Sequence, residues 1–245
     1  MHVLSAVALL DVWEYGASRP EAQRAVELLA VAYPETSPDS LAALSIGQRD
    51  ARLLTLREEL WGPQMAALVV CPGCREQLEL TLNAREMLSE VPLEHPSEIP
   101  LNVAGYSVTF RLPTTLDVAD ATSRASDPET CRQLILHRCL LSSQQGNVPV
   151  DSRHLPPEVI TELAKSMAEA DPLADIQLAL SCPSCKQEWR AAFDIVSFLW
   201  TEIEVWARRI LTEVHTLARA YGWRERDILN LSPVRRQFYL EMVGA

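Results

Sequence analysis

The tetrapeptides CPGC at residues 71–74 and CPSC at residues 182–185 decide the architecture of this chain. A shift of 111 residues (71 to 182, 74 to 185) lays CPGCREQLELTLNAREML over CPSCKQEWRAAFDIVSFL. Each copy has Cys-Pro-small-Cys, a basic residue (Arg75 or Lys186), a strand-like stretch and a capped helix. The repeat therefore predicts two β-hairpins of one design, each with two thiols in its turn.

The chemistry of the two turns favours a zinc site. A CxxC turn directs two thiolates at one point, and two such turns complete a tetrahedron around Zn²⁺. Four protein ligands leave no open coordination position, so the zinc would be structural. Arg75 and Lys186 are placed to offset the negative charge of four thiolates. The predicted ligands are Cys71, Cys74, Cys182 and Cys185.

Other interpretations of the two CxxC turns remain open. A thioredoxin-like redox CxxC normally opens a helix, whereas both turns here lead straight back into a strand. The turns can also be ordinary turns with buried thiols, or a site that has lost its metal. We favour one shared zinc site, which clamps two distant segments of the chain.

Composition and charge limit the classes of function. The chain has 245 residues, 48% of them hydrophobic, and a net charge of −11. A folded core is therefore expected, and a general nucleic-acid or anionic-membrane binder is not. Residues 186–245 are nearly neutral, with 9 basic and 8 acidic residues, so this segment can meet an acidic protein surface.

The N-terminal stretch MHVLSAVALLDVWEYG is predicted to be a first helix and not an export signal. It has no Lys or Arg before its apolar run and no small-residue cleavage site after it. No run of about 18 uncharged apolar residues predicts a membrane span. The six cysteines are therefore expected in a reducing compartment, where CxxC pairs favour metal or redox chemistry over structural disulfides.

Periodicity and capping residues predict a mainly helical chain with short strands. Helices are expected at 5–33 with a break near Pro20, and at 45–62, 115–124, 128–141, 157–170, 194–222 and 232–243. Extended segments are expected at 65–84, 101–113, 175–181 and 187–193, and loops at 33–40, 92–100 and 142–157. The helix from 128 is expected to open with the capping box Ser126-Asp-Pro-Glu129.

The predicted fold class is α+β and mainly helical. It combines a four-cysteine zinc-ribbon hub of two pseudo-repeated β-hairpins with flanking helices and a long C-terminal helix. The expected regions are an acidic helical region at 1–64, a zinc-ribbon core at 65–193 and C-terminal helices at 194–245. The core would carry an inserted hairpin and helices at 101–170.

No motif predicts catalysis. Phosphate-binding glycine loops, a Gly-x-Ser-x-Gly elbow and HExxH are all missing from the sequence. Cys131, His137 and Cys139 have poor ligand geometry on one helix and are expected to be half-buried core residues. The sequence thus predicts a protein that is not an enzyme and has no small-molecule substrate. An enzyme whose catalytic residues converge only in three dimensions stays open as an alternative.

The C-terminal helices carry residue types that are enriched in protein-binding hot spots. The tryptophans can either pack into this protein's own core or bind a partner, and the two roles can coexist. The candidate partner-binding residues are Trp200, Trp206, Arg208, Arg209, Trp223, Arg235, Arg236 and Tyr239.

Three stretches together resemble a known family: VTFRLPTTLDVADA (108–121), CPSCKQEWRAAFDIVSFLW (182–200) and ARAYGWRERDILNLSPVRRQFYLEMV (218–243). They are similar to baseplate hub assembly proteins of T-even myophages and of phage-tail-like contractile injection systems. The resemblance covers about residues 65–245 and offers no counterpart for the N-terminal helical region. It implies a non-enzymatic assembly factor or minor structural component, with protein partners in a tail baseplate, in the bacterial cytoplasm.

A zinc-ribbon protein that binds nucleic acid or regulates is the rival hypothesis. Such proteins usually present a basic face. The ribbon strands here mix Glu76, Glu79 and Glu188 with Arg75, Lys186 and Arg190, which favours protein contacts instead.

Overall fold

The computed structural model describes residues 4–89 and 96–244. The chain is α+β and mainly helical with small antiparallel sheets, which confirms the predicted class. Its internal contacts divide it into two compact units, residues 1–35 with 196–245 and residues 36–195. The three regions expected from the sequence stay a prediction, which the folding of separate fragments would test. Within the described residues, no helix is both long and apolar enough to cross a membrane.

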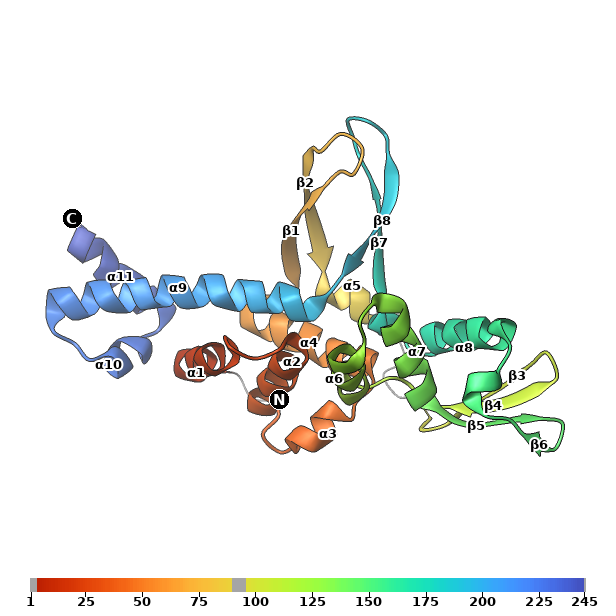
Figure 1. Ribbon diagram of the computed structural model, residues 1–245. Coiled ribbons are helices and arrows are strands. Elements are labelled where there is room, and N and C mark those ends of the chain that lie inside the picture. Colours follow the sequence, from red (N-terminus) through yellow and green to blue (C-terminus); the bar gives the residue numbers. More distant parts are fainter. Residues whose placement is uncertain (1–3, 90–95, 245) are drawn as a thin grey trace. The chain divides into compact units, whose positions relative to one another are not determined.

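The first unit is built from helices that come from both ends of the chain (Figure 1). They are α1 (Ala6–Gly16), α2 (Glu21–Ala32), nearly all of α9 (Ile195–Tyr221), α10 (Glu225–Leu229) and α11 (Pro233–Gly244). Ser5 caps α1, and Gly222 ends α9 with a φ of 67°, a conformation that favours glycine. The core of this unit contains Leu10, Ala207, Ile210, Val214, Leu217, Ile228 and Leu229.

The helices of the second unit are α3 (Pro38–Ala42), α4 (Ile46–Trp61), α5 (Ala84–Ser89), α6 (Thr115–Arg124), α7 (Pro128–Cys139) and α8 (Pro157–Ala170). Helix α4 begins as predicted at Ser45, which forms a capping box with Gln48. The amide of Gly47 also donates to Asp171, 3.0 Å away at the end of α8. This bond joins the start of α4 to a segment more than a hundred residues later.

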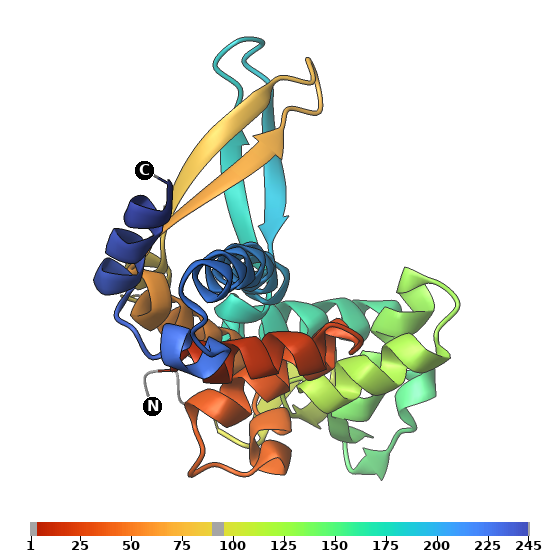
Figure 2. The ribbon, with the colours of Figure 1, turned by 90° about the vertical axis from the view of Figure 1, so that its left-hand side faces the viewer.

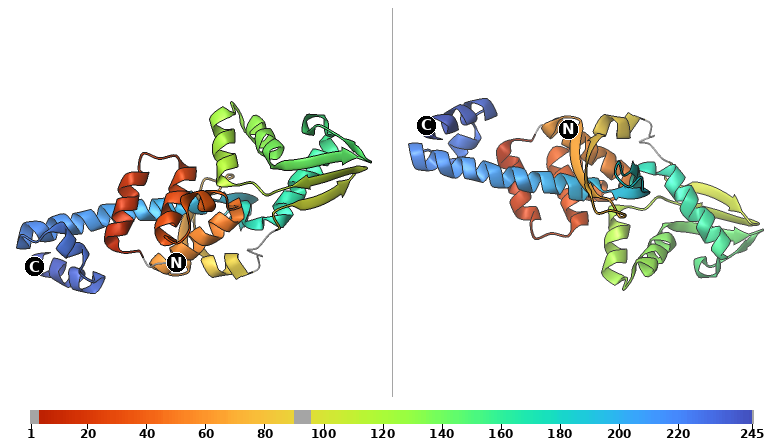
Figure 3. Two further views of the ribbon diagram at one scale, coloured as in Figure 1. Left: turned by 90° about the horizontal axis from the view of Figure 1, so that it is seen from below. Right: turned by 90° about the horizontal axis from the view of Figure 1, so that it is seen from above.

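An antiparallel sheet in the second unit has the strand order β3 (Ile99–Val103), β4 (Tyr106–Phe110), β5 (Leu140–Gln145), β6 (Val148–Pro149). The predicted hairpin at 101–113 is confirmed, since Ala104 and Gly105 form its turn with φ values of 51° and 79°. Helix α8 lies against one face of the sheet (Figure 3). The core there contains Val108, Phe110, Leu112, Leu136, Cys139, Leu155, Val159, Leu163 and Met167.

Two further hairpins carry the CxxC turns. Strand β1 (Gln64–Val70) pairs with β2 (Gln77–Asn83), and β7 (Ile176–Ser181) pairs with β8 (Glu188–Phe193). Figures 1 and 2 show the two hairpins side by side, with their turns at the same end. The sequence predicts these strands because apolar and polar residues alternate along β2 and β7.

The predicted loop at 142–157 is wrong. Most of it forms β5, β6 and a 3₁₀ turn at Ser152–His154. The polar stretch Leu140–Gln145 becomes a strand because β4 supplies a pairing edge, with Val108 opposite Ser143. Ser143 is buried and donates to the carbonyl of Val150 at 2.6 Å. The periodicity of apolar residues does not predict this strand, because its structure depends on pairing with β4.

Smaller corrections concern helix starts. Asp127, not Ser126, caps α7 and accepts from the amide of Thr130, because a carboxylate one residue later competes successfully for the same role. The predicted loop at 33–40 contains the start of α3, which Ser37 caps. Of the connector predicted at 92–100, residues 92–95 lie outside the described residues and residues 99–100 begin β3.

Candidate metal centre

The cysteine sulfurs of the two CxxC turns converge at one point. All four Sγ atoms lie within 4.8 Å of one another. The Sγ of Cys71 is 3.6 Å from that of Cys185, and the Sγ of Cys74 is 3.6 Å from that of Cys182. Sulfurs placed tetrahedrally at about 2.3 Å from a metal are about 3.8 Å apart, whereas a disulfide needs about 2.05 Å. The spacing fits ligands of a shared metal ion and not disulfides.

The backbone of the first turn holds its cysteines in a fixed geometry. The amide of Cys71 donates to the carbonyl of Glu76 at 2.9 Å, and the amide of Arg75 donates to the carbonyl of Cys71 at 3.0 Å. Arg75 has a φ of 66°, which is left-handed. In the second turn the same two bonds, at 2.9 and 3.0 Å, join Cys182 to Gln187 and Lys186 to Cys182. Lys186 has a φ of 61°, so the two turns share one conformation.

Backbone amides point at the sulfurs. The amide of Cys74 lowers the pKa of the Cys71 thiol to about 7, because its hydrogen bond stabilises the thiolate more than burial opposes it. The amide of Glu76 lowers the pKa of Cys74, but partial removal of its sulfur from water and the neighbouring thiols raise it to about 12 overall. Amides that favour thiolates suit a metal site, since metals bind deprotonated sulfur.

Burial differs within each pair. Cys71 and Cys182 are fully buried, and Cys74 and Cys185 are exposed. One thiol of each turn therefore faces the protein and the other faces solvent. A bound metal would be reachable by a chelator from the solvent side.

A carboxylate that the sequence reasoning did not single out for the site lies against the cluster. Glu76 Oε2 is 3.9 Å from the Sγ of Cys182, on the other hairpin. The sequence shows only that Glu76 lies two residues after Cys74. Its contact with Cys182 exists because the two hairpins meet in the folded chain. Arg75 and Lys186, predicted to offset the charge of the sulfurs, have exposed side chains.

The chain was compared with known proteins. The model of the family described as "T4 bacteriophage base plate protein" matches residues 12–200, well over half of the chain. The chain belongs to this family. No curated protein and no solved structure matches it.

The extent of the match corrects the sequence resemblance. The baseplate family model begins within α1, so the N-terminal helical region has a counterpart in the family. Residues 201–245, which carry one of the three resembling stretches, lie beyond the match. Proteins of a baseplate are generally structural and not enzymes, and they contact other tail proteins.

Several candidate partner-binding residues are used inside this baseplate protein. Trp200 is 7% exposed and packs so close to Gly16 that a Cβ there would lie 2.5 Å from its ring. Arg236 is 6% exposed and donates to Glu213 at 2.7 Å. The interpretation as a core residue applies to Trp200, and Arg236 is buried as well. Neither contributes an exposed surface to a partner.

The other candidates lie at or near the surface of the first unit. Trp223 stacks on Tyr221 with ring centroids 4.6 Å apart and meets Tyr239 edge-on at 4.9 Å. Trp223, Tyr239 and Trp206 are half-buried, whereas Arg208, Arg209 and Arg235 are exposed. Trp223 and Tyr239 thus pack together at the end of α9, whereas Arg208 and Arg209 form ion pairs with glutamates along that helix.

Helix α11 also exposes apolar residues that the sequence reasoning did not single out. Val234 is 80% exposed, Phe238 62% and Met242 48%. Their spacing of four residues places them along one face of the helix. The sequence contains this spacing, but only the packing of Tyr239 and Leu240 on the other side shows which face stays open.

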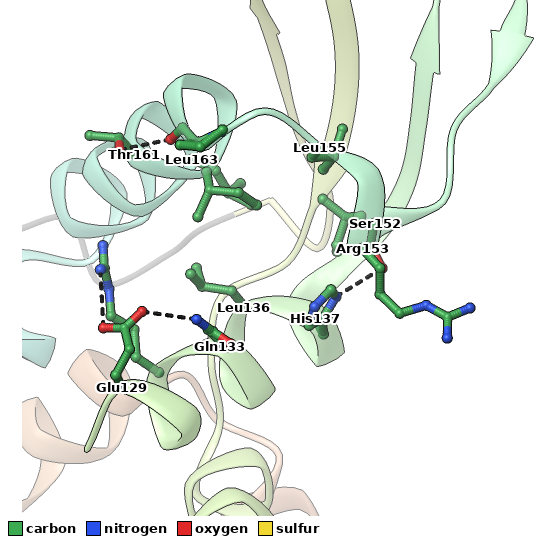
Figure 4. Close-up of a pocket in the computed structure, with 13 residues that line it drawn as sticks. Glu129, Gln133, Leu136, His137, Ser152, Arg153, Leu155, Thr161 and Leu163 are labelled. Atoms are coloured by element: carbon green, nitrogen blue, oxygen red, sulfur yellow. Dashed lines mark hydrogen bonds and ion pairs between the residues drawn. The ribbon is translucent and has the colours of Figure 1, made fainter. Parts of the chain in front are cut away.

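A pocket of about 380 Å³ lies between α7, the 3₁₀ turn and α8 (Figure 4). Leu136, Leu155 and Leu163 line its apolar part. At its rim, His137 Nδ1 and Ser152 Oγ are hydrogen-bonded at 2.8 Å. His137 is exposed, so its predicted place in the core is wrong.

The His137–Ser152 pair lacks the third group of a nucleophilic triad. The neighbouring carboxylate, Asp151, pairs with Arg153 at 2.8 Å instead. In the part of the chain that the structure describes, no carboxylate is bonded to the His137 ring. The pair is therefore a surface hydrogen bond between α7 and the 3₁₀ turn and offers no basis for an acyl-transfer mechanism.

Proposed function

We propose that this chain is a non-enzymatic structural component or assembly factor of a contractile-tail or injection-system baseplate. It acts through protein–protein contacts, and the work takes place in the bacterial cytoplasm. The family match over residues 12–200 carries the proposal. The sequence also lacks phosphate-binding glycine loops, a Gly-x-Ser-x-Gly elbow and HExxH, which agrees with this proposal.

The metal in this proposal is zinc, held by Cys71, Cys74, Cys182 and Cys185. Four thiolates on one ion select zinc or iron–sulfur chemistry, and paired CxxC turns with tetrahedral sulfur spacing are typical of structural zinc. Bound zinc would make the two hairpins one zinc-ribbon hub of pseudo-repeated halves. Because the inward side chains of β2, β7 and β8 are only partly buried, the ion would supply much of the stability of the hairpins.

The contact surface in this proposal is the open side of the C-terminal helices. It combines the apolar stripe of α11 (Val234, Phe238, Met242) with exposed arginines (Arg208, Arg209, Arg235). An aromatic residue among apolar neighbours with a polar rim is the usual composition of a binding hot spot. These residues lie beyond the family match, so they would provide specificity for the partners of this particular baseplate.

Nucleic-acid binding by the ribbon is the weaker hypothesis. The hairpins place Glu79 and Glu188 among their exposed residues beside Arg190. Mixed charges of this kind do not neutralise a run of phosphates. A gel shift that weakens steeply with salt would support this alternative.

Co-purification tests the proposed function. The chain, with an affinity tag, is co-expressed with the baseplate proteins encoded in the same locus. We expect at least one of them to be retained on the tagged chain. Retention of none of them would overturn the proposal.

Substitutions then test the contact surface. We expect Val234→Ser with Phe238→Ser to reduce retention of the partner at least about tenfold, the effect of losing one hot spot. The matched control is Leu116→Ser, because Leu116 is 54% exposed on α6, in the second unit and outside the proposed surface. Equal loss with the control would show that the surface is misplaced while leaving the family role intact.

A further inference from the structure

Strand β1 presents an apolar face to solvent. Its inward residues are Met65, which is buried, and Ala67 and Val69, which are partly covered. Its outward residues are Ala66, Leu68 and Val70. Leu68 is 69% exposed and Val70 is 51% exposed. From Gln64 to Val70 the strand carries no charge.

The same strand has an open backbone edge. The amide of Cys71 donates to the carbonyl of Glu76. Because hydrogen-bonded and non-hydrogen-bonded pairs alternate in an antiparallel ladder, every second residue of β1 before Cys71 has its backbone groups directed at β2. The N–H and C=O groups of Ala66, Leu68 and Val70 therefore point away from β2. In the described part of the chain, β1 pairs with β2 alone.

The second hairpin serves as an internal control for this face. The shift of 111 residues places Gln177 at the position of Ala66, Ala179 at that of Leu68 and Ser181 at that of Val70. All three are exposed, as their counterparts are. A hairpin of this design therefore folds without large apolar side chains at these positions. The folding of β1 does not explain why Leu68 and Val70 are large and apolar.

Four other strands carry features that discourage pairing, whereas β7 is uncharged but presents only the three polar or small residues named above outward. Pro100 lies in β3 and Pro149 in β6, and proline removes a donor. Strand β2 exposes Glu79, and β8 exposes Glu188 and Arg190. β1 combines an open edge, no charge and large apolar side chains, which is the composition that natural edges avoid unless they are used.

We propose that β1 is a dimerisation edge, which pairs antiparallel with β1 of a second copy of this chain. A two-fold axis at Leu68 would place Leu68 beside its own copy and Ala66 beside Val70 of the other chain. The outward backbone groups of these residues are the ones an antiparallel partner needs. The result is a continuous four-stranded sheet, β2–β1–β1–β2, with an apolar strip across its centre.

The lack of charge from Gln64 to Val70 makes β1 an edge at which a second copy can pair. The chain carries a net −11 and repels its own copy wherever acidic residues meet. The nearest acidic residue to the strip is Glu79, which lies opposite Leu68 on β2. In the dimer the two Glu79 residues would be three strand spacings apart, about 14 Å, which exceeds the Debye length of about 8 Å. β1 is thus an edge where self-association meets little repulsion.

The interface is small. A single strand pair buries less than the roughly 1,600 Å² of a standard interface, so we expect a dissociation constant in the micromolar range or weaker. Such a contact becomes effective where copies are held close together in an assembly, since linkage raises the effective concentration.

Sedimentation velocity of the full chain, with its metal and under reducing conditions, tests the proposal over concentrations up to several hundred micromolar. We expect a monomer–dimer equilibrium. The variant A66Q/L68A/V70S, which copies the outward residues of β7, should weaken dimerisation at least tenfold and fold normally by circular dichroism. The matched control is T81Q, on the outward face of β2 but away from the open edge, and it should dimerise as the wild type does.

Amide hydrogen exchange locates the contact. The amides of Ala66, Leu68 and Val70 should become more protected as the concentration rises in the wild type but not in the triple variant. A wild type that stays monomeric throughout would overturn the proposal and leave this edge to a strand of another protein. A dimer that leaves these amides unprotected, or that the triple variant forms equally well, would overturn it too.

Discussion

At the scale of single residues, the cysteines outside the CxxC turns separate two roles of a thiol. Cys139 is buried in the core of the second unit, and burial raises its pKa to about 12, so it stays protonated. The amide hydrogen bonds at Cys71 lower the pKa of that thiol instead. The same side chain is thus a small apolar core residue in one place and a metal ligand in our proposal in the other.

Loss of one sulfur should abolish metal binding. We expect Cys74→Ser and Cys185→Ser to reduce bound zinc from about one ion per chain to near zero, because three thiolates bind far more weakly than four. The control is Cys131→Ser, which lies outside the cluster. Zinc measured by mass spectrometry after dialysis is the readout. Full zinc content in Cys74→Ser would contradict a four-sulfur site.

Asp117 is the carboxylate on which the junction of β4, α6 and α7 depends. Burial by itself would raise its pKa, but hydrogen bonds from Arg111 and Arg138 outweigh burial and hold the pKa well below the ordinary range. These bonds are 2.6 and 2.9 Å long, and Asp117 is 1% exposed. Two arginines from different elements therefore depend on one charge.

Asp117→Asn should lower the free energy of unfolding at pH 7 by about 2 kcal/mol. This is less than for a fully buried ion pair, because the side chains of Arg111 and Arg138 are 30% and 39% exposed. Because the folded pKa is lowered, the stabilisation is present above the unfolded value of about 3.9 and is lost as the pH falls below it. Urea unfolding of both proteins between pH 7 and pH 3 should show the difference shrinking. Asp120→Asn, a more exposed partner of Arg138, should cost under about 1 kcal/mol.

At the scale of elements, each CxxC turn depends on a left-handed residue that is not glycine. Arg75 and Lys186 hold φ values of 66° and 61° at equivalent positions. A residue with a Cβ is strained there by about 1–2 kcal/mol. Their retention at both turns is consistent with a role for positive charge beside four sulfurs.

Glycine at these positions separates backbone strain from charge. We expect Arg75→Gly and Lys186→Gly each to raise the free energy of unfolding by about 0.5 kcal/mol, since relief of strain exceeds the extra freedom of the unfolded chain. Arg75→Gln keeps the strain and removes the charge, and should lower zinc affinity by less than about tenfold. Denaturant unfolding with competitive zinc titration measures both effects. Destabilisation by glycine would show that the side chain matters more than the backbone.

At the scale of the whole molecule, the cysteine cluster joins segments more than a hundred residues apart, while the main cores lie elsewhere. One core of the second unit lies between the sheet and α7 and α8, further fully buried residues of that unit lie on α4 (Leu53, Leu54, Leu56), and a core of the first unit lies around α9. Neither core contains a cysteine of the cluster. Metal should therefore stabilise the hairpins locally and leave the folds of both cores largely unchanged.

Removal of the metal tests this division. A zinc chelator should speed amide exchange in β1, β2, β7 and β8 at least about tenfold, because the hairpins lose the ion that joins them. Amides in α9 and in β4 should keep their protection. Hydrogen exchange followed by mass spectrometry of peptides resolves the two groups. Global loss of protection would mean that the cluster holds the entire fold together.

The sequence by itself determined the local structure and the four cysteines of the candidate metal centre. Helix caps such as Ser45, the Ala104–Gly105 turn and the paired CxxC spacing act within a few residues, so they are readable without a partner. The helix ends at Gly62 and Gly222 are local in the same way. The family resemblance depended on short stretches of sequence. It identified the baseplate family but did not predict which residues match the family.

Tertiary structure alone decided which side chains are open to partners. Trp200 and Arg236 are residue types of a binding surface, yet Trp200 is buried against α1 and Arg236 is buried and bonded to Glu213 of α9. The polar stretch at 140–145 became a strand because β4 offered it an edge. Leu68 looks like an ordinary core residue until the pairing of β1 turns it outward. Exposure depends on what packs against a residue, and that is settled between segments that no local pattern connects.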